Sequence, residues 1–252
     1  MIKVILCALN EEPNLRQLIE DLAKQFSLLE QKFEIIICID GSTDNSYSLL
    51  CDLQKLYPLK ILAVKNQRGL GLSRNRVYCE AVKNGVNSDD IVIHLDADNS
   101  HDPAQIAIML NNFHQNNLDI VVASRFCDKS TMRGFPLKRQ LVSYLVSLFM
   151  QNMIGLRKIS KQKLKDYSSG YRVYRASKIK ELYDIYGDKM IAEKDFSSTC
   201  EVICKLGKLG AKIDEIPIQY DYSKKLGGSK LRIIRNACQL GVLAVKLRIK
   251  SN

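Results

Sequence analysis

Two aspartates stand one residue apart at the end of an apolar run in HLDADNSHDP, residues 94–103. Asp96 and Asp98 can turn into one loop and offer the hard carboxylate oxygens that Mg²⁺ or Mn²⁺ prefers. Such a cation can bridge a diphosphate and neutralise the charge that develops as the diphosphate leaves. The alternative is a polar turn in which Asp102 caps a helix that begins at Pro103. That alternative explains Asp102 but not the two aspartates before it.

Two further polar turns follow apolar runs. In CIDGSTDNS, residues 38–46, Asp40 ends a strand-like segment and can accept hydrogen bonds from the N–H groups of a nucleoside base. The helix that follows is open to phosphate at its N-terminus, although a turn capped by Asp44 explains the same residues. In ALNEEPN, residues 8–14, Glu11 is a candidate for reaching the same nucleoside.

A glycine- and arginine-containing segment, NQRGLGLSRNRVYCEA, covers residues 66–81. It contains G-x-G but lacks the third glycine of the dinucleotide fingerprint and follows the third expected strand, which argues against NAD. Arg68, Arg74 and Arg76 lie near the start of the expected helix. They are candidates for phosphate contacts or for solvated surface positions.

These turns belong to a regular alternation of strands and helices in residues 1–125. The expected strands cover residues 2–8, 33–39, 59–64, 90–95 and 118–123, and the expected helices cover residues 13–29, 44–56, 71–84 and 103–116. Strands that are apolar on both faces and alternate with helices predict a doubly wound α/β fold, with a mostly parallel sheet and helices on both faces. Such a fold binds ligands at the carboxyl ends of its strands, where the polar turns lie.

The second part of the chain has a looser pattern. The expected helices cover residues 136–156, 176–186, 196–206 and 229–249, and the expected strands cover residues 170–174 and 211–220. Because no repeat or low-complexity linker separates the parts, we expect a single domain over residues 1–252. Within it, residues 1–125 form one half, residues 126–228 a second half, and residues 229–252 a basic amphipathic C-terminal helix.

Charge is distributed unevenly along the 252 residues, of which 46% are hydrophobic and 26% are charged. The 38 Lys and Arg residues outnumber the 27 Asp and Glu residues, for a net charge of +11. Residues 1–126 hold 12 basic and 16 acidic side chains, net −4, whereas residues 127–252 hold 26 and 11, net +15. This asymmetry indicates two anion-handling tasks in different places. No zinc-finger, RNP1-like or basic-zipper pattern is present, so we expect no nucleic-acid partner.

The cysteines and the apolar segments indicate the cellular compartment in which the protein works. None of the eight cysteines forms a C-x-x-C pair, and we interpret them as reduced, mostly buried thiols of a cytoplasmic protein. The N-terminal residues do not resemble a signal peptide. No window of about 18 residues is apolar enough to span a bilayer. The uncharged residues 141–156 are expected to form a buried or an interfacial helix.

The ordered set of motifs resembles family 2 glycosyltransferases of the GT-A fold. In chain order these motifs are N-E, D-G-S-T-D, R-G-L-G-x-x-x-N, D-A-D-x-S-H-D-P, S-G-Y-R and G-x-S-K, within about residues 2–235. The set is most similar to the dolichyl- or polyprenyl-phosphate mannosyltransferase branch. The resemblance implies a nucleoside-diphosphate sugar donor, GDP-mannose or a UDP-hexose, and an Mg²⁺ or Mn²⁺ cofactor.

The resemblance also assigns donor-side residues. It implies that Asn10, Glu11 and Asp40 hold the base and ribose, that Arg68 and Ala97 lie in the donor site, and that Asp96 and Asp98 bind the metal and the diphosphate. Two positions depart from the family. Ser100 stands where a third metal-side residue is often glutamine, and Ile39 stands where the family has a second aspartate.

Basic residues of the second half complete the resemblance. Arg125 and Arg139 are 14 residues apart, the spacing of two phosphate-contacting arginines in the mannosyltransferase branch. Lys224 and Lys230 match the R-x-x-G-x-S-K segment, with lysine in place of its arginine, so a point charge replaces a bidentate fork. The family places S-G-Y-R, residues 169–172, beside the acceptor.

These observations predict an inverting, metal-dependent transfer of a hexose to a lipid-linked acceptor, with Asp98, Arg125, Arg139 and Lys230 as the catalytic set. A lipid phosphate acceptor is already ionised and needs no general base. The alternative acceptor is a sugar hydroxyl in cell-surface polysaccharide or lipopolysaccharide, with Glu193 or Asp195 as candidate base. The sequence argues against a nucleotidyltransferase, which needs a glycine-rich basic loop after the first strand, and against a non-catalytic sugar- or nucleotide-binding protein, in which the paired aspartates would be dispensable.

A lipid acceptor implies a peripheral enzyme on the cytoplasmic face of a membrane. Residues 141–156 and the basic C-terminal segment are the candidates for contact with an anionic surface. The alternative for the C-terminal helix is that its apolar face packs on the sheet and its basic face remains in water.

Overall fold

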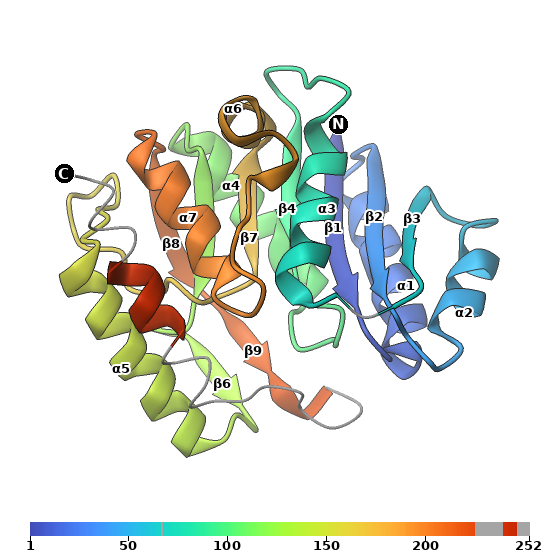
Figure 1. Cartoon of the computed structure of the whole chain (residues 1–252), viewed down its shortest axis with the longest axis horizontal. Helices are drawn as coiled ribbons and strands as arrows, with labels where there is room; N and C mark the ends of the chain where they lie inside the picture. Colours follow the sequence, from blue (N-terminus) through green and yellow to red (C-terminus); the bar gives the residue numbers. More distant parts are fainter. Residues whose placement is uncertain (67, 225–238, 246–252) are drawn as a thin grey trace.

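A seven-stranded sheet forms the centre of the molecule and carries helices on both faces (Figure 1). The computed structural model describes residues 1–66, 68–224 and 239–245. The strand order is β3-β2-β1-β4-β7-β5-β8, and neighbouring strands are parallel except that β7 runs antiparallel to both β4 and β5. The strands are β1 (Ile2–Ala8), β2 (Phe33–Asp40), β3 (Leu59–Val64), β4 (Ile91–His94), β5 (Ile120–Ser124), β7 (Arg172–Arg175) and β8 (Ile213–Pro217).

The helices form two layers, each with its own apolar core. In the described residues before residue 239, the α-helices are α1 (Glu12–Leu28), α2 (Ser46–Leu53), α3 (Leu70–Val82), α4 (Ile106–Gln115), α5 (Leu137–Met153), α6 (Ala176–Tyr186) and α7 (Ser198–Lys208). Side chains of α1, α2 and α4 pack in one buried cluster, and side chains of α3, α6 and α7 pack in the other. Because both faces of the sheet are covered, β2 is buried without a break from Ile35 to Asp40. The predicted α/β fold is confirmed.

Smaller elements extend the carboxyl edge of the sheet. Strands β6 (Thr131–Arg133) and β9 (Gln219–Asp221) pair in parallel as a separate two-stranded sheet. Short 3₁₀ helices cover Pro103–Gln105, Gly187–Lys189 and Tyr222–Lys224. The single strand expected over residues 211–220 is therefore two strands, β8 in the central sheet and β9 in the small one.

The C-terminal helix expected over residues 229–252 lies mostly outside the described residues. Residues 239–245 are helical, and Leu240, Leu243 and Ala244 are buried in the same cluster as Met150 of α5. Over the described ranges, no helix combines the length and the apolar character that a membrane crossing needs.

Candidate active site at the carboxyl edge of the sheet

The loops that follow β1 and β2 are joined by side-chain hydrogen bonds. The Asn10 backbone N–H donates to Ser42 Oγ at 2.9 Å, and Asn10 Oδ1 accepts the Thr43 N–H at 2.7 Å. Glu12 Oε2 accepts the N–H of Asn45 at 3.0 Å. Asn10 adopts φ 51°, a left-handed conformation that asparagine tolerates better than most residues. Parallel strands thus bring the two predicted donor loops together at one edge.

Glu11 and Asp44 stabilise the two helix starts at this joint. Glu11 precedes α1, and its Oε2 accepts the side-chain N–H of Asn14 at 2.8 Å. Asp44 accepts the N–H of Ser46, the first residue of α2, at 3.0 Å, and the N–H of Glu12 at 3.1 Å. Burial opposes ionisation of Asp44, but these hydrogen bonds outweigh burial and lower its pKa. Asp44 therefore accepts a backbone N–H at the start of α2, although the N-cap residue is Asn45 and not Asp44 as predicted, and it also bonds to Glu12 of α1.

Asp40 holds the loop between β3 and α3. Its side chain lies at the end of β2 and is buried, and its two carboxylate oxygens accept the backbone N–H groups of Arg68 and Gly69, both at 2.9 Å. Gly69 has φ +107°, a conformation that L residues rarely adopt. Arg68 itself is exposed. Asp40 therefore fixes the position of Arg68 at the rim of the site.

Asp96 and Asp98 differ in exposure within the D-x-D turn, residues 96–100. The Asp96 side chain is 38% exposed, whereas Asp98 is buried and its Oδ1 accepts the Ser100 hydroxyl at 2.5 Å and the Ser100 N–H at 3.2 Å. Ala97 and Ser100 are buried on either side of this carboxylate. Ser100 thus orients Asp98, and Asp96 presents its carboxylate outward.

His101 supports the turn from below. The Asp96 backbone N–H donates to His101 Nδ1 at 3.1 Å, and the ring stacks on Tyr171 at 4.9 Å and meets Tyr220 edge-on at 5.5 Å. Burial lowers the pKa of His101, against the opposing influence of Asp96 and Asp98. A neutral ring that accepts at Nδ1 carries its proton on Nε2, which lies 3.9 Å from Asp96 Oδ2.

The turn fits a divalent cation that the substrate helps to hold. Among the described residues no three His, Cys, Asp or Glu side chains form a metal-binding group. Mg²⁺ is commonly held by one or two carboxylates together with substrate phosphates and water, rather than by a cage made only of protein. Asp96 and Asp98 provide such a carboxylate pair, and the outward Asp96 is the one on the solvent side.

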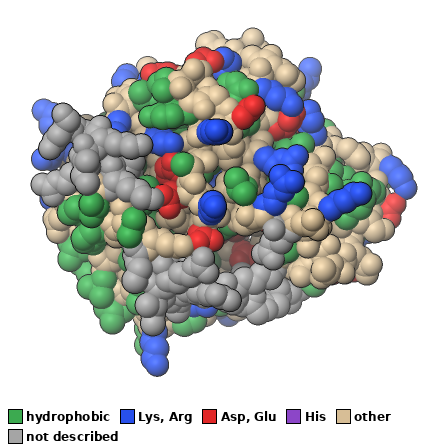
Figure 2. Space-filling view, in the orientation of Figure 1, with side chains coloured by type: hydrophobic (Ala, Val, Ile, Leu, Met, Phe, Trp, Pro, Cys, Tyr) green, Lys and Arg blue, Asp and Glu red, His purple; other side chains and the backbone are tan. Residues whose placement is uncertain are grey.

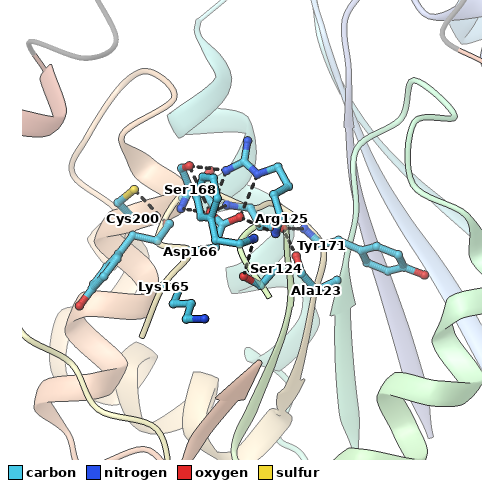
Figure 3. A network of polar contacts seen from close by, with 12 residues as sticks. Ala123, Ser124, Arg125, Lys165, Asp166, Ser168, Tyr171 and Cys200 are labelled. Carbon is cyan, nitrogen blue, oxygen red and sulfur yellow. Dashed lines mark hydrogen bonds and ion pairs between the residues drawn. The ribbon is translucent and has the colours of Figure 1, made fainter. Parts of the chain in front are cut away.

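Arg125 forms a two-pronged ion pair with Asp166 (Figure 3). Arg125 Nε and Nη2 donate to the two oxygens of Asp166, both at 2.8 Å, and Nη2 also donates to Ser168 Oγ at 2.5 Å. Burial opposes ionisation of Asp166, yet the adjacent guanidinium lowers its pKa to about 2. The predicted phosphate-contacting Arg125 is thus held in one orientation by a carboxylate whose role the sequence did not reveal.

The Asp166 loop, residues 166–170, lies against the D-x-D turn. Asp166 Oδ1 accepts the backbone N–H groups of Ser168 and Ser169 at 3.0 and 2.9 Å. A Cβ placed on Gly170 would lie 3.0 Å from Asp96 Oδ1. The S-G-Y-R segment and the outward aspartate therefore meet, and glycine is needed for that close approach.

Arg139 stands on the first turn of α5, beside an aromatic group. Its Nη1 donates to Tyr222 Oη at 2.9 Å and its guanidinium lies 5.8 Å from the Tyr222 ring centroid. The Tyr222 ring is 6.3 Å from the ring of Tyr220, which meets His101 next to the D-x-D turn. The Lys224 side chain and the whole of Lys230 lie outside the described residues, so their predicted contacts stay predictions.

The loop that carries Glu193 and Asp195 is fixed by α3 and α7. The Gly71 N–H donates to the Lys194 carbonyl at 2.8 Å, and Glu201 Oε2 accepts the N–H of Glu193 at 2.8 Å. The candidate bases also have partners of their own: Ser197 donates to Glu193 Oε2 at 3.0 Å, and Gln239 donates to Asp195 Oδ2 at 2.5 Å.

Two arginines are buried beneath these loops. Arg74 is 1% exposed and donates to Ser198 Oγ at 2.5 Å, so it is not the solvated surface residue that its sequence position allowed. Arg172 is fully buried and donates to the carbonyls of Tyr167 and Thr199, both at 2.7 Å. Both arginines tie the start of α7 to the rest of the site. Sequence gave no signal of this burial, because arginine is rarely fully enclosed.

Solved structures with this architecture define its class. Glucosyl-3-phosphoglycerate synthase of Mycobacterium tuberculosis, in complex with phosphoglyceric acid, aligns with a TM-score of 0.62 over 99% of this chain and 79% of its own, at 17% identity. TarS 1-349 of S. aureus, in complex with UDP-GlcNAc, aligns with a TM-score of 0.62 over 98% and 66%, at 19% identity. The fold is that of the GT-A class.

The model of glycosyl transferase family 2 matches residues 3–183, so the chain belongs to this family. An undecaprenyl-phosphate mannosyltransferase of Micrococcus luteus is 30% identical over 142 residues, 56% of this chain and 53% of the relative. A dolichol-phosphate mannosyltransferase of Pyrococcus furiosus is 28% identical over 233 residues, 92% of this chain and 59% of the relative. The chain thus spans a little over half the length of these two relatives.

Proposed function

We propose that this chain transfers a hexose from a nucleoside-diphosphate sugar to polyprenyl phosphate, with inversion at the anomeric carbon and with Mg²⁺ or Mn²⁺ as cofactor. The observation that carries the proposal is the contact between Asp96 and Gly170, which joins the metal-side turn to the loop beside the expected acceptor. The names of the M. luteus and P. furiosus relatives support the choice of a polyprenyl-phosphate acceptor.

On the donor side, the joint between the β1 and β2 loops is proposed to receive the nucleoside. Asn10, Glu11 and Asp40 lie at this joint or beside it, and Arg68 stands at its rim. A divalent cation held by Asp96 and Asp98 would neutralise the diphosphate as it leaves. Ser100 is proposed to belong to the metal side of the site, and it orients Asp98 through its hydroxyl.

On the acceptor side, an oxygen of the lipid phosphate attacks the anomeric carbon and the bond to the diphosphate breaks, with its electron pair leaving on the diphosphate. The attacking oxygen is already ionised at neutral pH, so no proton has to be removed. Arg139, Lys224 and Lys230 are proposed to stabilise the phosphate charges. Arg125 is proposed to act from its fixed position on Asp166.

A transfer assay with the full chain tests this proposal. GDP-mannose, UDP-glucose and related donors are incubated with polyprenyl phosphate, with Mg²⁺ or Mn²⁺ or with EDTA, and the lipid-soluble product is measured. We expect one donor to give product only with metal, and Asp98→Asn to lower the rate by about two orders of magnitude. Asp52→Asn, an exposed aspartate on α2, is the matched control and should retain the rate. Transfer that survives both EDTA and Asp98→Asn would refute metal dependence.

The same assay separates the two acceptor classes. If product appears only with a glycan acceptor, the acceptor group is a sugar hydroxyl and not a lipid phosphate. In that case a base is required, and the double variant Glu193→Gln with Asp195→Asn should lose transfer. Full transfer to polyprenyl phosphate by this double variant is the result that the proposal predicts. The anomeric configuration of the product, determined by NMR, tests inversion.

We also propose that the enzyme acts at the cytoplasmic face of a membrane. The seven described cysteines are all free thiols, which suits a reducing compartment. The phosphate of a polyprenyl phosphate lies at the surface of the bilayer that holds its chain, so the transfer is proposed to take place at that surface.

A further inference from the structure

Helix α5 turns its apolar side to solvent. Only Ser147 and Met150 of its 17 residues are buried. Six large apolar side chains at helical spacing are between 41% and 80% exposed and form the α5 stripe, namely Leu137, Leu141, Tyr144, Leu145, Leu148 and Phe149. Hydrophobic side chains gather along the edge of the molecule formed by α5 (Figure 2). Contiguous apolar exposure of this kind marks an interaction surface.

The segment that contains α5 is basic throughout. Residues 129–165 hold six lysines and three arginines and no acidic residue. Exposed cations stand on both sides of the helix, Arg133 and Lys138 near its start and Arg157, Lys161 and Lys163 after its end. A 17-residue helix is about 25 Å long, so an apolar strip of that length is flanked by positive charge at each end.

We infer that the α5 stripe docks on an anionic lipid bilayer, with the helix lying in the plane of the interface. Aliphatic and aromatic side chains can enter the region between headgroups and acyl chains, and lysine and arginine at the flanks meet the phosphates. The charge of the segment favours this partner, because a neutral apolar groove would offer no counter-charge to the exposed lysines and arginines at the two ends of the helix.

A second copy of the chain is a poorer occupant for this surface. A two-fold dimer through the α5 stripe would place residues 129–165 of one copy against the same residues of the other. That contact would bring two basic segments without acidic residues together, and like charges at an interface oppose association.

The docking surface adjoins the site through the first turn of α5. Arg139 bonds to Tyr222, whose ring neighbours Tyr220, which meets His101 beneath the D-x-D turn. This part of the inference rests on the proposed function: a lipid phosphate at the membrane surface would then lie on the same side of the molecule as the expected acceptor site.

Sedimentation with lipid vesicles tests the docking surface in the full chain. The triple variant Leu141→Ser, Leu145→Ser, Leu148→Ser removes apolar surface that is already exposed, so the fold is spared. The matched control replaces Leu28, Leu56 and Ile108 by Ser, because these are exposed by 71%, 72% and 60% on other elements. Vesicles are made of phosphatidylcholine, with and without one third phosphatidylglycerol.

We expect the wild type and the control to bind the anionic vesicles. The triple variant at Leu141, Leu145 and Leu148, called the α5 variant, should bind them at least about tenfold more weakly. Lys138→Gln with Arg157→Gln should weaken binding to the anionic vesicles about tenfold as well. Wild-type protein that stays unbound, or equal binding by the two triple variants, would overturn the inference. A dimer in analytical ultracentrifugation that the α5 variant alone dissociates, with no vesicle binding, would assign the surface to a second copy instead.

Transfer to a water-soluble short-chain polyprenyl phosphate separates this inference from the proposed function. If the α5 variant retains soluble transfer and loses vesicle binding, both stand. If no protein shows transfer while the difference in vesicle binding persists, the proposed function fails and the docking surface remains.

Discussion

Asp166 shows how one carboxylate organises the acceptor side of the site. It is fully buried, and burial by itself would favour the neutral acid. The two donors of Arg125 and the backbone N–H groups of the Asp166 loop reverse that preference and lower its pKa to about 2. The same contacts fix the direction of Arg125 and the turn that brings Gly170 to Asp96.

Replacing Asp166 by asparagine should destabilise the protein strongly. Asp166→Asn leaves Arg125 largely buried beside a neutral amide, and breaking one partner of a buried ion pair costs about 3–5 kcal/mol. Urea unfolding measures the loss. Asp52→Asn is the control, since Asp52 and Lys55 are 65% and 73% exposed and their pair is worth about 1 kcal/mol or less. Equal losses in the two variants would contradict this account of the pair.

The same variant predicts a pH dependence. An unperturbed aspartate has a pKa of 3.8, whereas the pKa of Asp166 in the folded protein is about 2, so its ionised form stabilises the fold above about pH 4. This contribution, about 2 kcal/mol, is lost as the pH falls through the folded pKa. The difference in unfolding free energy between wild type and Asp166→Asn should therefore narrow by about 1 kcal/mol from about pH 6 to about pH 3. Burial raises the pKa of Glu215, and the charge of Asp166 adds to this rise, so titration of Glu215 acts on stability with the opposite sign.

The place of a side chain in the fold could be predicted where its position relative to a strand or helix end determines it. Asp40 and the pair Asp96 and Asp98 follow apolar strands, and parallel strands must end at one edge, so their location was predictable. Asp102 accepts the Ala104 N–H and caps the short helix at Pro103, as its position indicated. The partners of Arg125 and Arg74 come from 41 and 124 residues away, and local pattern carries no information about such pairs.

Among the structural elements, the start of α3 connects the end of β2 to the 193–195 loop. Asp40 holds the backbone of Gly69, and two residues later the Gly71 N–H bonds to the Lys194 carbonyl. A Cβ on Gly71 would lie 1.9 Å from the carbonyl oxygen of Glu193. The helix and the 193–195 loop can approach this closely only because Gly71 has no side chain.

Gly71→Ala should therefore separate α3 from the 193–195 loop. The neighbour is backbone and cannot rotate away, so we expect a loss of about 1–3 kcal/mol in urea unfolding. Gly241→Ala is the matched control, because no atom lies within 4 Å of its Cβ and its position is helical. That control should be neutral or stabilising by up to about 1 kcal/mol. A Gly71→Ala protein as stable as wild type would show that the contact can relax.

The order of strands was less predictable than their existence. The segment that forms β7 was expected as a strand, but nothing local places it between β4 and β5. Its position is decided by pairing over more than 50 residues, for example Arg175 with Asp119 through an ion pair at 3.0 Å. The sequence also left open whether the apolar face of α5 is buried or exposed, because a buried helix and an interfacial helix have the same composition.

For the whole molecule, β7 interlocks the two halves of the chain. It pairs antiparallel with β4 through Arg172–Arg175 and with β5 through Tyr174, Val173 and Arg172. Both β4 and β5 belong to residues 1–125, so a strand from the second half fills the middle of the sheet of the first. The contrast in charge, net −4 against net +15, therefore does not mark two separate folding units.

We propose on this basis that residues 1–125 do not fold cooperatively alone. Without β7, the facing edges of β4 and β5 lose their backbone partners and the buried Val173 leaves a gap between two apolar strands. Circular dichroism during urea unfolding should show a single cooperative transition for the full chain and a broad, non-cooperative loss of signal for residues 1–125. Mixing in residues 126–252 supplies β7 and should sharpen the transition. A cooperative transition of residues 1–125 alone, with a midpoint near that of the full chain, would show instead that these residues form an independent domain.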